Sequence, residues 1–226
     1  NRFEKTSLTL KTLDGQELAA ALYAPRLDEA TPLKGGVVFS HMMPATKESW
    51  DSLATKLAEA GYLGLAFDLR GHGESMGGPR AYAKFTDEEH QKSILDLDAA
   101  ARFLIGRGLA AAQIAFVGAS IGANLSLRYI SDHHDFKTAV LLSAGLDYRG
   151  LKSEAAAASL VAGQRVLVLA SRDDDENAAE NEVIYTALPA GVVRGLKIYD
   201  AGGHGTRLLE SHPELMKIIL AFISGS

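Results

Sequence analysis

The sequence predicts an α/β fold, in which a mostly parallel, eight-stranded sheet begins with an antiparallel hairpin and carries helices on both faces. Two observations predict it. Strand and helix patterns alternate along the chain from residue 37 onward, and the later strand segments are short, continuous apolar runs, typical of strands covered on both faces. A composition of 47% hydrophobic and 23% charged residues in 226 residues is that of a globular protein with one well-buried core. We therefore expect a single domain over residues 1–226.

The strands are predicted by their apolar patterns. Residues 6–13 alternate and residues 17–23 are apolar-rich, and Asp14-Gly15 between them is a strong hairpin signal. Because they are short apolar runs, six further segments are expected to be strands, at residues 37–40, 63–68, 114–117, 139–142, 166–170 and 196–199.

The helices are predicted by apolar residues at helical spacing. One helix carries Trp50, Leu53 and Leu57. A long helix is expected to open at the capping box Thr86–Glu89 and to present Ile94, Leu97, Ala101 and Leu104 on one face. The last helix is lined by Leu215, Ile218, Ile219 and Phe222.

The stretch from Gln113 to Asn124 is the most informative part of the chain. An apolar strand runs into Gly118-Ala119-Ser120-Ile121-Gly122, and a helical pattern begins directly behind it. A strand–turn–helix elbow of this kind lifts one serine hydroxyl clear of a parallel sheet, and its neighbours two positions away must be small. Gly118 and Gly122 meet that need. We therefore expect Ser120 to be a nucleophile rather than a small residue in a tight turn.

Suitable partners for Ser120 follow two later strands. Reactive groups in open α/β sheets lie beyond the carboxyl ends of the strands. The strand at 166–170 is followed by Ser171-Arg172-Asp173-Asp174-Asp175, and the strand at 196–199 by Ala201-Gly202-Gly203-His204-Gly205. A serine hydroxyl needs a neighbouring base to take its proton, and His204 is expected to do this and to return the proton to the leaving alcohol.

With these residues in place, the chain resembles the α/β-hydrolase superfamily over nearly its whole length, and most of all its small bacterial esterase and dienelactone-hydrolase-like branch. Four motifs in the family's order carry the resemblance, namely Ser40-His41, Asp68–Ser75, the Ser120 elbow and Gly203–Thr206. The resemblance implies a Ser-His-Asp triad. The family's spacing from the strand end places the acid at Asp174, with Asp173 as its rival and Asp175 as a weaker one.

The resemblance also implies an oxyanion hole made of two backbone amides. One is expected to belong to Ile121, the residue after the nucleophile. The other is expected in the turn His41-Met42-Met43-Pro44, at Met43, with Met42 as the alternative. The family's common pattern has glycine where this chain has Met42, which leaves the course of the turn open. Both methionines are expected to line one wall of the mouth, and His41 is expected to be structural.

Charge and composition exclude several other classes. The formal net charge of −5 and the lack of a Lys/Arg cluster argue against nucleic acid as a partner, and no apolar run is long enough to cross a membrane. With no cysteine, disulfides, thiolate metal sites and cysteine nucleophiles are excluded. No metal or organic cofactor is implied. Because the chain begins with Asn1, we expect that a segment has been removed, with an export signal favoured over trimming of a cytoplasmic chain.

The spacing between strands bears on the substrate. Larger relatives place a helical cap between the sixth strand and the acid-bearing strand, where this chain has only residues 145–164. We expect one helix there, centred on residues 154–158, and hence an open, capless site that favours small-molecule esters with short acyl chains. Thioesterase, aminopeptidase-like or amidase, and perhydrolase activities remain alternatives on the same triad. A dienelactone hydrolase proper is disfavoured because that group uses cysteine. A non-catalytic binding protein on this fold is the rival of another class. The oligomeric state is left open.

Overall fold

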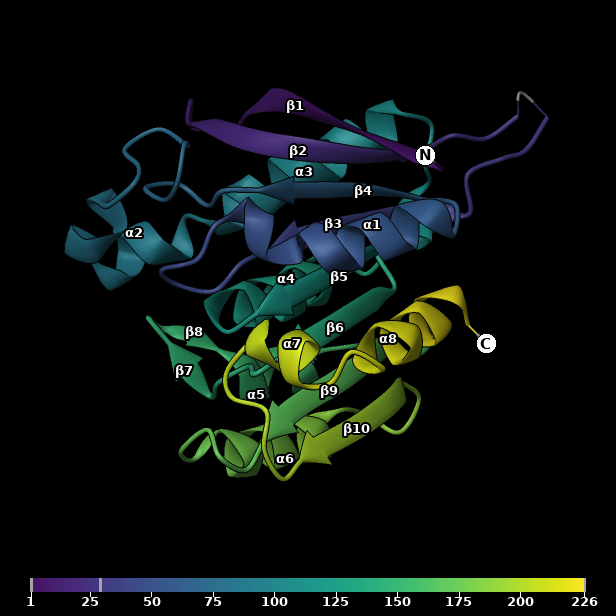
Figure 1. The fold of residues 1–226 in the computed structure, drawn as a ribbon. Helices are drawn as coiled ribbons and strands as arrows, with labels where there is room; N and C mark the ends of the chain where they lie inside the picture. Colours follow the sequence, from purple (N-terminus) through teal and green to yellow (C-terminus); the bar gives the residue numbers. More distant parts are fainter. Residues whose placement is uncertain (1, 29, 226) are drawn as a thin grey trace.

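The computed structural model describes residues 2–28 and 30–225. Eight strands form one sheet in the order β1-β2-β4-β3-β5-β6-β9-β10 (Figure 1). Their bounds are β1 Phe3–Lys11, β2 Glu17–Pro25, β3 Gly35–Ser40, β4 Tyr62–Phe67, β5 Ile114–Ala119, β6 Thr138–Leu142, β9 Arg165–Ser171 and β10 Val193–Tyr199. The pairs β1–β2 and β2–β4 are antiparallel, and every other pair in the sheet is parallel. The predicted sheet and its N-terminal hairpin are therefore confirmed.

Helices cover both faces of this sheet. They are α1 Asp51–Glu59, α2 Asp87–Gln91, α3 Ile94–Gly106, α4 Ile121–Asp132, α5 Ser153–Ala158, α6 Asn177–Ala187, α7 Arg207–Ser211 and α8 Leu215–Ser224, with short 3₁₀ turns η1 Lys47–Trp50, η2 Ala81–Lys84 and η3 Ala111–Gln113. Figure 1 shows α1, α7 and α8 in front of the sheet and α3 and α4 behind it. None of the helices within the described residues is both long and apolar enough to cross a membrane.

The core is divided by the sheet into two apolar clusters. Because successive side chains of a strand point to opposite faces, Val37 and Phe39 of β3 pack with Trp50 and α1, whereas Val38 packs with Leu97 and α3. All five side chains are fully buried. The continuous apolar runs that predicted these strands thus reflect burial on both sides of the sheet.

Two sequence-based expectations are wrong in detail. The long helix after Thr86 is two helices, because residues 93, 95 and 96 bond three residues back instead of four and so tighten the chain between α2 and α3. The capping box at Thr86 and Glu89 is present and opens α2. Residues 145–164 hold α5, but a two-stranded hairpin, β7 Asp147–Tyr148 and β8 Leu151–Lys152, precedes it.

Candidate active site

Ser120 stands at a strained elbow between β5 and α4. Its backbone angles are φ 54° and ψ −121°, a conformation that costs a non-glycine residue about 1–3 kcal/mol. The Ser120 amide donates to the carbonyl of Leu142 on β6 at 2.9 Å, and the Ser120 carbonyl accepts from the amide of Ala123 at 2.9 Å. The side chain is half-buried at the carboxyl end of the sheet. The local geometry is that of a nucleophile elbow.

Gly118 and Gly122, two positions before and after Ser120, allow close contacts between backbone segments. A Cβ atom at Gly118 would lie 2.1 Å from the carbonyl oxygen of Gly122, and a Cβ atom at Gly122 would lie 2.2 Å from that of Ser40. Real Cβ atoms do not come so close to a carbonyl oxygen. The elbow therefore requires glycine at both positions, and the contact with Ser40 sets the start of α4 against the end of β3.

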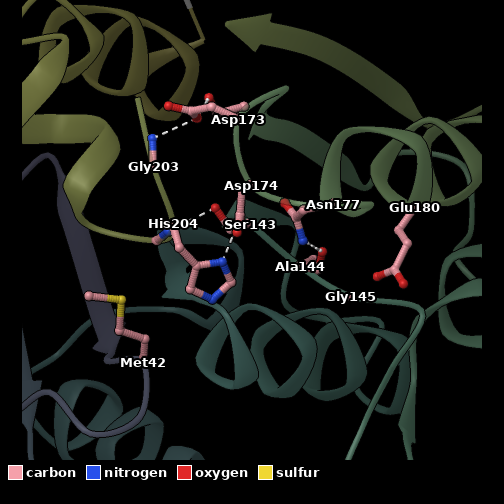
Figure 2. A network of polar contacts seen from close by, with 12 residues as sticks. Met42, Ser143, Ala144, Gly145, Asp173, Asp174, Asn177, Glu180, Gly203 and His204 are labelled. Atoms are coloured by element: carbon pink, nitrogen blue, oxygen red, sulfur yellow. Dashed lines mark hydrogen bonds and ion pairs between the residues drawn. The ribbon is translucent and has the colours of Figure 1, made fainter. Parts of the chain in front are cut away.

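Asp174 and His204 meet at the same edge of the sheet. Asp174 follows β9 and His204 follows β10, and these strands are neighbours. The Nδ1 atom of His204 lies 2.5 Å from Oδ2 of Asp174 (Figure 2). The Asp174 side chain is 16% exposed and the His204 side chain 33% exposed, so the contact is sheltered while the imidazole still reaches the surface. A carboxylate on Nδ1 leaves Nε2 as the ring atom that can accept a proton.

Asp173, the rival acid, binds backbone rather than imidazole. Its carboxylate accepts hydrogen bonds from the amides of Gly203 at 3.0 Å and Gly202 at 3.2 Å, and from the Ser171 hydroxyl. The bond from Ser171, together with the two amides, lowers the pKa of the Asp173 carboxyl. Asp175 is exposed, with a positive φ of 44°. Of the three acids, Asp174 is the one in contact with His204.

The loop that carries His204 packs onto the elbow. A Cβ atom at Gly205 would lie 3.4 Å from Cβ of Ala119, the residue before Ser120. The Gly205 amide donates to Oγ of the buried Ser143 at 2.8 Å. Ser143 follows β6 and has a positive φ of 56°. Sequence reasoning missed this residue, because nothing local marks a serine whose partner lies 62 positions away. These contacts hold the loop of His204 against the end of β5, next to the elbow.

The turn after β3 is held by His41. This side chain is fully buried; its Nδ1 donates to the Met42 carbonyl at 2.9 Å, and its Nε2 accepts from the Leu69 amide at 2.9 Å. Both ring nitrogens are therefore satisfied only when the imidazole is neutral. Burial, and next the neighbouring His72, lower the pKa of His41 from 6.5 to about 4.

The sequence analysis predicts that the two methionines of this turn line one wall of the mouth, but the structure places them on opposite faces of the sheet. Met42 packs with the core cluster on the α1 side and against the loop of Gly205, whereas Met43 packs with the cluster on the opposite face. Figure 2 shows the Met42 side chain below the loop that carries His204. Within the described residues, the amides of Met42, Met43 and Ile121 donate no hydrogen bond to another part of the chain. These three amides are thus free donors within the part of the chain that the structure describes.

Comparison with known proteins agrees with this architecture. The chain belongs to the α/β-hydrolase family described as serine aminopeptidase, S33, whose model matches residues 31–173 and so ends before Asp174 and His204. No curated protein sequence is similar to the chain.

Solved structures share the fold at low sequence identity. A putative dienelactone hydrolase from Klebsiella pneumoniae superposes with a TM-score of 0.80 at 19% identity, covering 100% of both chains. The Pyrococcus furiosus esterase Pf2001 superposes with a TM-score of 0.76 at 21% identity, covering 99% of this chain and 93% of that one. An esterase from Exiguobacterium antarcticum gives 0.73 at 14% identity, with 96% and 99% coverage.

The glycine at the start of α4 is open to a direct test. We expect Gly122→Ala to lower the free energy of unfolding by about 1–3 kcal/mol, because the added methyl collides with the Ser40 carbonyl. In a helix without such a collision, replacing glycine by alanine stabilises the protein by about 0.5–1 kcal/mol. Gly106→Ala is the matched control, since Gly106 lies in α3 with nothing within 4 Å of a new Cβ. Urea denaturation measures both, and equal stability of Gly122→Ala and wild type would contradict the close contact.

His41 makes the fold sensitive to acid. Its folded pKa, about 4, is below the ordinary 6.5, so between these values the unfolded chain binds the proton and the folded chain does not. The contribution of neutral His41 to the free energy of unfolding is therefore complete above pH 6.5 and is lost as the pH falls toward 4. We expect the free energy of unfolding to fall by about 2 kcal/mol from pH 7.5 to pH 5 through this group. His41→Asn, which cannot titrate, should flatten the measured pH dependence by that amount; an unchanged slope would argue against it.

Proposed function

We propose that this protein is a serine hydrolase that cleaves carboxylic esters, with Ser120 as nucleophile, His204 as general base and Asp174 as the acid that orients the histidine. The observation that carries the proposal is the 2.5 Å contact between Asp174 and His204, in a loop packed against the residue before Ser120. Membership in a hydrolase family and the shared fold of solved esterases support it.

The proposed reaction has two halves. In the first, His204 takes the proton of the Ser120 hydroxyl while Oγ attacks the ester carbonyl, and it then gives that proton to the departing alcohol. Asp174 holds the ring in the tautomer whose Nε2 is free and stabilises the imidazolium that forms. In the second half, water attacks the acyl carbon while His204 takes a proton from it. The bond between the acyl carbon and Oγ then breaks, Oγ takes the proton back from His204, and the carboxylic acid is released.

The negative charge that develops on the carbonyl oxygen needs fixed donors. We propose the amides of Ile121 and Met43 for this role. Both donors are free among the described residues, and the contact of Gly122 with Ser40 sets the turn after β3 against the start of α4. Backbone amides cost no reorganisation when the charge forms, because their direction is set by the fold.

The proposed substrate class follows from the short segment between β6 and β9, where larger relatives have a helical cap. Between β6 and β9 the chain has only the β7–β8 hairpin and the six-residue helix α5. The β7–β8 hairpin and α5 together are too small to provide much apolar surface for a long acyl chain of the substrate. We therefore propose short-chain acyl esters as the preferred substrates.

The first experiment is hydrolysis of p-nitrophenyl esters from acetate to palmitate by wild type and Ser120→Ala. We expect turnover to peak at short chains, and Ser120→Ala to lower kcat by about 10⁵-fold or more. A preference for long chains would contradict the open site.

A fluorophosphonate probe provides the control, since it labels an activated serine whatever the substrate. Wild type should be labelled and Ser120→Ala should not. Labelling without ester turnover would point to thioesters or peptides. No labelling at all would overturn the proposed function in favour of a non-catalytic protein on this fold.

The two neighbouring acids allow a matched comparison. Asp174→Asn should lower kcat by about 10⁴-fold, because the amide stabilises the wrong tautomer of His204 and no longer balances the imidazolium. Asp173→Asn keeps an oxygen acceptor for the Gly203 amide and should cost far less. Equal losses in the two variants, measured on p-nitrophenyl acetate, would show that Asp174 has no special role.

A further inference from the structure

A tyrosine that the proposed mechanism does not use lies beside His204. Tyr148 ends β7, in a hairpin whose turn residues Arg149 and Gly150 both have positive φ, 56° and 82°. This is the turn geometry that fits the twist of two short strands. The centroid of the Tyr148 ring lies 6.4 Å from that of His204, edge to face. The hairpin thus brings a phenol to the rim of the site.

The hairpin is fixed to the helix that begins at the elbow. Asn124, one turn into α4, donates from Nδ2 to the carbonyls of Gly145 and Leu151, both at 2.9 Å, and accepts from the Gly145 amide at 3.0 Å. The Tyr148 ring lies on Gly145 so closely that a Cβ atom there would be 2.4 Å from Cζ of the ring. One buried side chain therefore holds both ends of the hairpin relative to Ser120.

The direction of the Tyr148 hydroxyl is set by a buried asparagine pair on α6. Asn181 donates from Nδ2 to Oδ1 of Asn177 at 3.1 Å, which identifies the other end of the Asn177 amide as its nitrogen. That nitrogen donates to the Ala144 carbonyl at 2.8 Å and to the Tyr148 oxygen at 3.2 Å. Figure 2 shows Asn177 facing the Ala144 carbonyl. The phenol oxygen accepts here, so its own proton is left to bond elsewhere.

Two acceptors lie near that proton. The carbonyl of Ser143 is 3.5 Å from the phenol oxygen, which is long for an O–H···O bond. The second is Oγ of Ser120, whose backbone amide is bonded at 2.9 Å to the carbonyl of Leu142, the residue before Ser143. The Ser120 side chain also influences the pKa of the phenol. Because Tyr148 follows β6 and Met43 follows β3, on opposite sides of β5, the phenol reaches Ser120 from the side opposite the proposed oxyanion turn.

We propose that Tyr148 is a further catalytic residue, whose hydroxyl donates a hydrogen bond to Oγ of Ser120; this inference rests on the proposed serine-hydrolase function. Oγ gains negative charge as its proton passes to His204 during attack, and again when it leaves the acyl carbon during deacylation. A donor on Oγ stabilises both transition states. Tyr148 keeps its proton throughout, and the proton that moves is the one shared by Oγ and His204.

The surroundings of Tyr148 suit a donor that never ionises. Burial, with the carboxylates of Glu180 and Asp174, raises the pKa of Tyr148 to about 12, although hydrogen bonds with Ser120 and Asn177 act in the other direction. The phenol is therefore neutral, with its proton in place, across the pH range in which His204 works as a base.

The test measures the nucleophilicity of Ser120 directly. We expect Tyr148→Phe to lower the second-order rate constant of fluorophosphonate labelling, and kcat/KM for p-nitrophenyl acetate, each by about 10–100-fold, the effect of one hydrogen bond to a charged atom. The loss should fall on kcat more than on KM, because the bond strengthens in the transition state. Tyr62→Phe is the matched control, since Tyr62 begins β4 at the opposite end of the sheet.

A second variant separates the hydroxyl from the ring. Tyr148→Leu removes both, so losses of similar size in the Phe and Leu variants would support the hydroxyl as the active part. Wild-type rates in Tyr148→Phe, or a loss confined to Tyr148→Leu, would overturn the proposal while leaving the serine hydrolase intact. A wild-type protein that is neither labelled nor active would instead mean failure of the proposed function itself.

Discussion

The contact between the backbone of α4 and the end of β3 is the constraint on which the rest of the site depends. It exists because Gly122 has no side chain to hold the Ser40 carbonyl away. In the same turn Ser120 has a positive φ, and the first amide of α4 has no hydrogen-bond partner inside the described chain. Strain and an unsatisfied donor are costs for stability, and they lie on adjacent residues of the elbow, the strain at Ser120 and the free amide at Ile121.

Around this elbow, buried polar side chains fix loops that apolar packing alone would leave loose. Ser143 holds the loop of His204, Asn124 holds the hairpin of Tyr148, and His41 holds the turn after β3. Each of them binds backbone rather than another functional side chain. Their shared effect is to convert flexible connections into parts of the scaffold, so the geometry of the site is set before any substrate arrives.

How much the sequence predicts depends on how local the signal is. Apolar runs and the Asp14-Gly15 turn were enough for the eight strands, and the glycines around Ser120 for the elbow. The resemblance to the α/β-hydrolases, through the family's spacing from the strand end, singled out Asp174, which the structure joins to His204, although its catalytic role stays a prediction. The β7–β8 hairpin was missed because two-residue strands are too short to show periodicity and Arg149 takes a positive φ that a turn search assigns to glycine or asparagine. The link from Asn177 to Tyr148 spans 29 positions and has no local signature.

Asp173 and Asp174 are adjacent, yet their carboxylates have different partners. The Asp173 carboxylate accepts hydrogen bonds from the amides of Gly202 and Gly203, whereas the Asp174 carboxylate binds the imidazole of His204. Both are anchored in the same turn at the end of β9. The turn and the histidine loop are therefore joined by two separate contacts, one to the backbone and one to the imidazole. Two contacts restrict rotation of the loop relative to the turn, which a single contact would allow. Thermal motion of this exposed corner then displaces acid and ring as a unit, and the alignment between them survives movement that a single contact would not.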